Sequence, residues 1–230
     1  MARVRQELEN RRQNTRCKDS TLYWLQHHTS TRDDHWLQKG TPQLAPFPDK
    51  PYFQTILDEF DRSKIIFLPK SREMMISWLI IGYAVHMAQW TPGSFIMIQS
   101  AKEDKSIDLV TGRNRPGYVR TLYEQQTPWL KNLHKLTKPP DQMPGDEFTW
   151  ANGSMIKGFP AGPDFVRQYH PALVIYDEAA FIPAFGASFE AAIPVSSKII
   201  AVSSAAPSEF GDLCRETFEL CGLNKPVNTP

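Results

Sequence analysis

The stretch Ala172-Leu-Val-Ile-Tyr-Asp-Glu-Ala179 decides the fold of this chain. Its first residues are largely apolar and rich in β-branched side chains, which predicts a strand buried on both faces of a parallel sheet. Asp177 and Glu178 follow at the carboxyl end of that strand, the edge where open α/β sheets bind ligands. Two adjacent carboxylates that lose water repel each other, and a magnesium ion with nucleotide phosphates is a common partner for such a pair. The alternative is a strand that ends in a solvated acidic turn.

Composition limits the class of protein. The chain has 230 residues and is 41% hydrophobic, which is enough for one core with a small appended subdomain. Its 26 basic and 25 acidic residues nearly cancel, so no overall field favours nucleic acid, although a local basic patch stays open. Cys17, Cys214 and Cys221 form neither metal-ligand spacing nor an even disulfide set, which indicates a reducing, intracellular setting. No apolar run suits a membrane span and the N-terminus is too charged for a signal peptide, so we expect no membrane partner.

Residues 1–50 differ from the rest. They begin with a basic segment of helical propensity, and the run Tyr23-Trp24-Leu25 is suited to packing such a helix on a core. A basic helix can contact phosphates, but a solvated face is the more common reason for such charges. Four prolines between Thr41 and Pro51 predict an extended linker. We therefore expect a basic N-terminal helical segment and Pro-rich linker over 1–50, and the main domain over 51–230.

Apolar runs and helical patterns alternate along the main domain. Helices are predicted at Tyr52–Phe60, Trp78–Trp90 and Phe210–Leu220, with a helix-rich segment at Lys102–Tyr123 and a short irregular helix at Phe181–Ala192. Further strands are predicted at Ile65–Leu68, Phe95–Ser100 and Lys198–Ser203, and a hairpin over Glu147–Phe159 has the Asn152-Gly153 pair typical of a type I′ turn. This alternation predicts an α/β fold with a mainly parallel central sheet flanked by helices.

The segment Lys70-Ser-Arg-Glu-Met-Met-Ile-Ser77 joins a predicted strand to a predicted helix, the arrangement in which helix N-termini bind phosphate. Only Ser77 matches the phosphate-loop pattern G-x-x-x-x-G-K-[ST] literally. Lys70 and Arg72 are the available cations for nucleotide phosphates, and Ser77 offers a hydroxyl for a metal. The alternative is a Ser77 that only caps a core helix.

Two further places in the sequence hold candidate site residues. Arg167 lies eleven residues before Glu178, in a loop expected near the sheet edge, where it could pair with a carboxylate or reach a neighbour's phosphates. Ser203 and Ser204 end the last predicted strand, where hydroxyls could sense a γ-phosphate or simply form a turn.

The order of these features resembles the ATPase domain of the large terminase subunit, the DNA-packaging motor of tailed bacteriophages. The resemblance covers about Pro51 to Leu220, and its most specific motif is Leu173-Val-Ile-Tyr-Asp-Glu-Ala-Ala-Phe181, which looks like the family's Walker B segment. It implies a P-loop NTPase of the additional-strand, RecA-like type that hydrolyses ATP with Mg²⁺. It also implies work on double-stranded DNA, with a portal protein and a small terminase subunit as partners. A homo-oligomeric ring at the procapsid portal vertex, in the host cell cytoplasm, is the implied assembly, with a monomer as an option in isolation.

The resemblance also implies residue roles. Asp177 and Ser77 would hold magnesium, Glu178 would position the attacking water, and Arg167 would enter the neighbouring subunit's site. The remaining positions of this set would be Gln54 at the adenine, Lys70, Ser71, Arg72, Ile76 and Ser77 at the phosphates, Arg72 also as a catalytic cation, and Ser203 and Ser204 in coupling phosphate loss to movement.

Two residues depart from the family's pattern. Met75 replaces a glycine, and its Cβ resists the positive φ that lets the loop curl under phosphates. Glu73 replaces a frequent glutamine and adds a negative charge. Both imply weak nucleotide affinity. The family's C-terminal nuclease domain has no counterpart here, so we expect no nuclease activity. Two other functions stay open: a helicase-like P-loop ATPase that acts on nucleic acid for another purpose, and a non-catalytic scaffold with a degenerate phosphate loop.

Overall fold

The structure is a computed structural model, and it describes residues 2–33, 36–40 and 42–220. Its helices are α1 (Ala2–Asp19), α2 (Thr21–His28), α3 (Trp36–Lys39), α4 (Phe53–Arg62), α5 (Ile76–Trp90), α6 (Glu103–Leu109), α7 (Tyr118–Glu124), α8 (Pro128–Leu133), α9 (Pro163–Arg167), α10 (Phe185–Ala192) and α11 (Glu209–Leu220), with 3₁₀ turns η1 (Pro140–Gln142) and η2 (Ala179–Phe181). Its strands are β1 (Ser30–Arg32), β2 (Leu44–Pro46), β3 (Ile65–Lys70), β4 (Phe95–Ser100), β5 (Glu147–Thr149), β6 (Met155–Phe159), β7 (Leu173–Asp177) and β8 (Ile199–Ser204).

A six-stranded sheet organises the chain, with strand order β3-β8-β7-β4-β6-β5. Every neighbouring pair is parallel except the β5–β6 hairpin. Strand β8 is inserted between β3 and β7, so the phosphate-loop strand and the acidic strand are not neighbours. The mainly parallel α/β fold with an additional strand, predicted from the sequence, is therefore confirmed. Because the five long strands are parallel, their carboxyl ends meet at one edge of the sheet.

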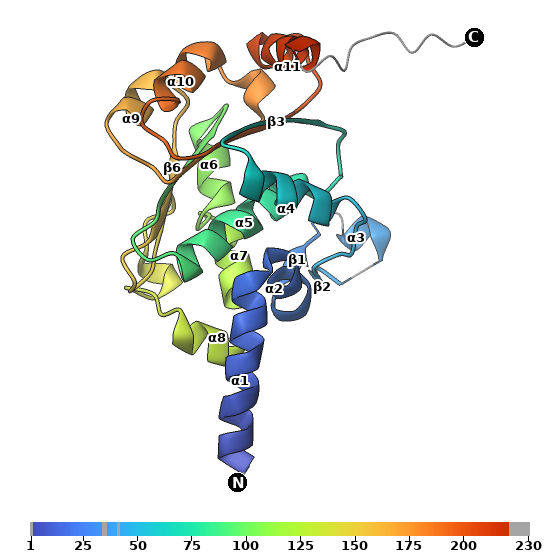
Figure 1. Ribbon diagram of the computed structural model, residues 1–230, viewed down its shortest axis with the longest axis vertical. Helices are drawn as coiled ribbons and strands as arrows, with labels where there is room; N and C mark the ends of the chain where they lie inside the picture. The colour runs from blue at the N-terminus through green and yellow to red at the C-terminus, as the bar shows by residue number, and fades with distance from the viewer. Residues whose placement is uncertain (1, 34–35, 41, 221–230) are drawn as a thin grey trace, which may run out of the picture.

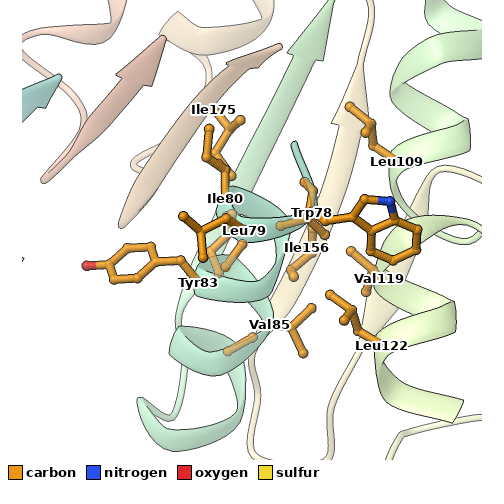
Figure 2. Packing of buried hydrophobic residues seen from close by; sticks show 14 of the residues in the cluster. Trp78, Leu79, Ile80, Tyr83, Val85, Leu109, Val119, Leu122, Ile156 and Ile175 are labelled. Atoms are coloured by element: carbon orange, nitrogen blue, oxygen red, sulfur yellow. The ribbon is translucent and has the colours of Figure 1, made fainter. Parts of the chain in front are cut away.

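Helices cover both faces of this sheet (Figure 1). On one face, α5 packs between the sheet and α7, and its side chains are buried almost all round the helix. Figure 2 shows this layer, with Trp78 of α5 against Val119 and Leu122 of α7. On the opposite face, α10 and α11 pack over a second apolar cluster that contains Phe185, Phe210 and others.

The two clusters reveal which way each strand side chain points. In β7, Leu173 and Ile175 belong to the cluster on the α5 face, whereas Val174 and Tyr176 belong to the cluster on the α10 face. This is the alternation that a strand imposes on successive side chains, and it lets the sequence assign each residue at the carboxyl edge to one face or the other.

The N-terminal region packs on the same core through its middle part. Trp24 and Leu25 of α2 are fully buried, and Phe47, directly after β2, is 4% exposed. Strand β2 pairs with β1, so the proline-rich segment, which we expected to be an extended linker, contains a short strand. Helix α1 projects from the body of the molecule (Figure 1). Within the described ranges, no helix is long and apolar enough to cross a membrane.

The structure contains the long apolar helices and strands that the sequence predicts. The sequence was less informative about the short elements. The helix at α5, the strands β3, β4, β7 and β8, and the hairpin β5–β6 are all present. The prediction of a type I′ turn is wrong. Such a turn needs a positive φ at both central residues, and here Gly153 has φ 85 but the φ of Asn152 is not positive. The Asn152 amide instead donates to the carbonyls of Ala88 and Gln89, which fixes the hairpin loop to the end of α5.

Candidate nucleotide site at the carboxyl edge of the sheet

Four polar side chains gather at the carboxyl edge on the α5 face. Lys70, Ser100, Asp177 and Ser204 are the last residues of β3, β4, β7 and β8. Each follows by two positions a residue of the apolar cluster on the α5 face, so each points to that face. The register pairs Lys70 with Ser204 and Ser100 with Asp177. The edge therefore presents a cation, two hydroxyls and a carboxylate to the helix that follows the loop.

Ser77 joins this group from the first turn of α5. Its hydroxyl donates a hydrogen bond to Oδ1 of Asp177, with 3.0 Å between the oxygens. The two residues are 100 positions apart in the sequence, and only the insertion of α5 against the sheet brings them together. The juxtaposition that the sequence predicted for Ser77 and Asp177 is present, and the alternative of a merely capping Ser77 is not: the N-cap position is Met75, without a side-chain cap.

The environment of Asp177 disfavours its charge. Burial raises the pKa of its carboxyl to about 6, and the neighbouring carboxylate of Glu178 adds to the rise. The hydrogen bond from Ser77 and the positive charges of Lys70 and Lys105 act in the opposite direction. The carboxylate is thus short of compensating positive charge, which is the condition of a site that binds a cation.

The loop between β3 and α5 turns through two left-handed residues, although it lacks glycine. Glu73 has φ 61 and Met75 has φ 58, both in the left-handed region that non-glycine residues rarely occupy. Tyr52, just before α4, donates its hydroxyl to the carbonyl of Met74 at 3.0 Å, which braces the loop from outside. We expected the Cβ of Met75 to resist a positive φ, but Met75 adopts one. The left-handed conformation is a source of backbone strain.

The other loop residues divide into exposed and buried ones. Ser71 and Arg72 are exposed at the start of the loop, where side chains can reach a ligand in solvent, and Lys70 is half-buried. Ile76 is 2% exposed and packs in the core, so only its backbone N–H is available to a phosphate. The first N–H groups of α5 have no partners within the helix, which makes the helix start a site for anions.

A cavity of about 500 Å³ opens beside this loop. Its walls come from the loop, the stacked rings of Trp78 and Tyr118, and the strands β1 and β2; they are Thr31, Arg32, Asp33, Ala45, Pro46, Pro48, Lys50, Lys70, Glu73, Met74, Met75, Ile76, Ser77, Trp78 and Tyr118. This volume lies within the range of small-molecule sites. Asp177 is not part of its wall, but Ser77, which donates a hydrogen bond to Asp177, is.

Glu178 and Arg167 occupy different surroundings. Glu178 is exposed directly after β7 and has φ 54, so the chain turns sharply at the residue and its carboxylate is accessible. Arg167 is exposed on α9 and pairs with Asp164 of the same helix at 3.5 Å. Tyr169, two residues further on, packs against Phe95 at the amino end of β4, with ring centroids 5.3 Å apart. The described contacts of Arg167 are thus with its own helix, and no side chain of the carboxyl-edge group is among them.

Two more predicted positions do not join the group. Ser203 follows Ala201 of the cluster on the α10 face, so its fully buried side chain points to the face opposite the loop, whereas Ser204 points toward it. Gln54 is exposed on α4, where its amide donates to Asp58 at 2.7 Å. It lines a separate cavity of about 300 Å³ against α2 and α5. The structure thus brings neither Ser203 nor Gln54 to the phosphate loop.

Residues that the sequence did not single out also lie at the edge. Ser100 is 1% exposed, and its hydroxyl has no hydrogen-bond partner. Lys105 lies in the first turn of α6 and its charge acts on Asp177. Tyr52 holds the loop. Of these three residues, only Ser100 could have been found from the sequence, because it ends a predicted strand. The contacts of Lys105 and Tyr52 depend on helix packing.

The donor set suits magnesium better than a softer metal. The described part of the chain has no cluster of three or more His, Cys, Asp or Glu side chains. A hydroxyl and a carboxylate in contact, with the remaining ligands from water and phosphate, is how Mg²⁺ is held in nucleotide sites. The residues present therefore fit that ion when it arrives with a nucleotide.

Comparison with known proteins bears on the fold. No protein-family model and no curated protein matches the sequence. Among solved structures, the large terminase of bacteriophage HK97 is similar with a TM-score of 0.62 over 91% of this chain, at 14% sequence identity. The chain has the fold of the part of that terminase that it matches.

Further similarities are weaker in geometry. The ATPase domain of the large terminase of Thermus phage P74-26 matches as a point mutant, with TM-score 0.49 and 21% identity over 79% of this chain and 73% of that chain. The same domain without the mutation gives 0.45 and 19% over 79% and 72%. The chain covers 42% of the HK97 terminase. The resemblance inferred from the sequence is therefore confirmed at the level of the terminase-like fold.

Proposed function

We propose that this chain is the ATP-hydrolysing domain of a DNA-packaging motor of the large-terminase type. The observation that carries the proposal is the contact between Ser77 and Asp177, on the sheet face that also presents Lys70 at the end of β3. A cation, a hydroxyl on a helix start and a carboxylate at the end of another strand of the same sheet are the parts that phosphoryl-transfer sites of this class need. The terminase-like fold supports the choice among such ATPases.

Each residue has a physical task in this proposal. Lys70 and the exposed Arg72 neutralise phosphate charge, while the N–H groups at the start of α5 bind phosphate oxygens. Ser77 and Asp177 would hold Mg²⁺, which would supply positive charge to the phosphates. Glu178, accessible at the strand end, orients the attacking water and accepts a hydrogen bond from it. Ser71 and the backbone of Ile76 line the phosphate site.

The nucleoside belongs, in this proposal, in the cavity beside the loop. That cavity already contacts the loop from Glu73 to Trp78, and its volume of about 500 Å³ accommodates a small ligand. Adenine recognition by Gln54, expected from the resemblance, would require the nucleotide to reach another cavity. A role for Ser204 in sensing the γ-phosphate is supported by its position on the α5 face of the sheet. Ser203 is on the opposite face, so any coupling through it would have to involve the helices α10 and α11.

The packaging role extends the proposal beyond the site. Double-stranded DNA as substrate, the portal protein and a small terminase subunit as partners, and a ring at the procapsid in the host cell cytoplasm are all proposed on the strength of the fold. Arg167, exposed and paired only with Asp164 among its described contacts, is proposed as the residue that completes the site of a neighbouring subunit.

Hydrolysis assays test the enzymatic part. We expect slow ATP hydrolysis by the purified chain that requires Mg²⁺ and stops with a chelator. Glu178→Gln should lower kcat about 100-fold or more while nucleotide binding persists, because it removes the group that orients water but no phosphate contact. Glu190→Gln, which changes an equally exposed glutamate on α10, is the matched control and should leave turnover unchanged.

Other outcomes favour the other functions. If no nucleotide binds at millimolar concentration in any oligomeric state, the chain is a scaffold and the ATPase proposal fails. If hydrolysis is present but single-stranded rather than double-stranded nucleic acid is translocated, the helicase-like function replaces DNA packaging.

A further inference from the structure

The hydroxyl of Ser100 is buried beside the candidate metal site without a partner. Ser100 ends β4, is 1% exposed, and its Oγ forms no hydrogen bond. A buried hydroxyl without a partner is unfavourable, so native structures rarely retain one without a reason. Two other buried serines are satisfied locally, since Ser94 donates to the carbonyl of Thr91 and Ser106 to that of Glu103. Ser188 and Ser203 also lack a partner, but they belong to the α10 side of the sheet, whereas Ser100 is on the face of the candidate site. Ser100 therefore requires an explanation.

Its position supplies one. Ser100 is paired in register with Asp177 on the adjacent parallel strand, and adjacent strands lie about 4.8 Å apart. Ile98 and Ile175, two residues earlier in each strand, both belong to the cluster on the α5 face, so both side chains point to that face. The Ser100 hydroxyl thus lies alongside the Asp177 carboxylate, on the side away from β8.

The carboxylate has capacity for another donor. A carboxylate accepts about four hydrogen bonds in all. Among the described residues, the side-chain hydroxyl of Ser77 is the one group that donates to it, and it uses Oδ1. Oδ2 is open, and a rotation of the Ser100 side chain is a small movement within a packed edge.

We propose that Ser100 is a positioning residue of the metal site: when the site is filled, its hydroxyl donates to the Asp177 oxygen that Ser77 leaves open. This inference rests on the proposed function, since it gives Ser100 a role in the same site. Ser77 holds the carboxylate from the α5 side and Ser100 from the β4 side, so its orientation toward the metal is fixed by two hydroxyls. Partners that orient a metal-binding carboxylate contribute typically ten- to a hundred-fold in metal affinity.

The test compares Ser100→Ala with Ser188→Ala. Ser188, on α10, is also fully buried with an unpartnered hydroxyl, but it belongs to the opposite face of the sheet. Binding of ADP is measured by calorimetry over a series of Mg²⁺ concentrations, and thermal unfolding is measured in a chelator. Ser100→Thr, which keeps the hydroxyl, serves as the conservative variant.

We expect Ser100→Ala to need about ten-fold more Mg²⁺ for half-maximal ADP binding. In the chelator, its unfolding temperature should not fall, because it loses a hydroxyl that has no partner. Ser188→Ala and Ser100→Thr should retain the wild-type Mg²⁺ requirement. An unchanged requirement in Ser100→Ala, with a wild-type protein that does respond to Mg²⁺, overturns this inference alone. A wild-type protein that binds ADP without any response to Mg²⁺, or not at all, overturns the proposed function and this role with it.

Discussion

Asp177 sits in a position that is unfavourable for an ionised carboxylate until a cation arrives. Burial raises its pKa to about 6, and the hydrogen bond from Ser77 compensates only in part. An acid whose pKa is raised in the folded state adds stability at low pH, fully below its ordinary value of 3.8, and this contribution is lost as the pH rises through about 6. The free energy of unfolding of the metal-free protein is therefore lower at neutral pH than at acidic pH by the contribution of this carboxylate.

Asp177→Asn should stabilise the metal-free protein at pH 8. The amide keeps an oxygen acceptor for Ser77 and removes the charge, so we expect a gain of roughly 1–3 kcal/mol, or several degrees in unfolding temperature. At pH 3, below the ordinary pKa of 3.8, the wild-type carboxyl is largely protonated in both the folded and the unfolded protein, so the gain should shrink toward zero. The measurement is thermal unfolding of both proteins in a chelator at the two pH values. An equal effect at both values would show that charge is not the cause.

Single residues also show where sequence reasoning stops. Ser203 and Ser204 are adjacent and alike in sequence, and both were assigned to the coupling of phosphate loss. Only the strand's alternation, read from the core residues Ala201 and Val202, separates them onto different faces. Gln54 lies on a helix that the sequence predicted, but the direction of its side chain depends on how α4 packs.

At the scale of elements, long apolar runs were predictable and short segments were not. Composition predicts the buried elements β4, β7, β8 and α5, because such elements need a continuous apolar surface. α8 and α9 have six and five residues, and such short helices form through tertiary contacts rather than through propensity. Strand β2, which pairs with β1, lies within the proline-rich segment for which the sequence predicts a linker.

The loop between β3 and α5 is the element on which the proposed nucleotide binding depends, and substitutions of Met75 test its geometry. Met75→Gly removes the side chain that strains the left-handed backbone, so its loss of packing should be offset and the free energy of unfolding should stay within about 1 kcal/mol of wild type. Met75→Ile places a β-branched residue at φ 58, where it is a severe outlier, and should lose about 2 kcal/mol or more.

Urea unfolding of the two variants provides the comparison. Nucleotide binding should follow the same order, because the same curl presents the N–H groups of α5. If Met75→Ile is as stable as wild type and binds nucleotide equally well, the left-handed conformation at this position is not required.

At the scale of the whole molecule, the surface position of Arg167 matters more than its local contacts. Its exposed pair with Asp164 is worth little in stability, so loss of the side chain should not unfold the protein. We expect Arg167→Ala alone to be inactive if each active site is completed by a neighbour. Mixed with equal amounts of Glu178→Gln, it should recover up to about one quarter of wild-type activity, because that fraction of interfaces combines an intact Glu178 with an intact Arg167.

The mixing experiment needs proof that mixed assemblies form, which light scattering of the combined proteins provides. A control mixture of Arg167→Ala with wild type defines the dilution expected without complementation. Absence of recovery in assemblies that do form would show that Arg167 does not act across subunits.

A structure of the wild-type chain with Mg²⁺ and a non-hydrolysable ATP analogue tests the central claim most directly. The account predicts triphosphate over the loop from Lys70 to Ser77, with the metal between the Ser77 hydroxyl and the Asp177 carboxylate and the nucleoside in the cavity bounded by β1 and β2. Nucleotide bound elsewhere, or a loop that remains empty at millimolar analogue and metal, would contradict it.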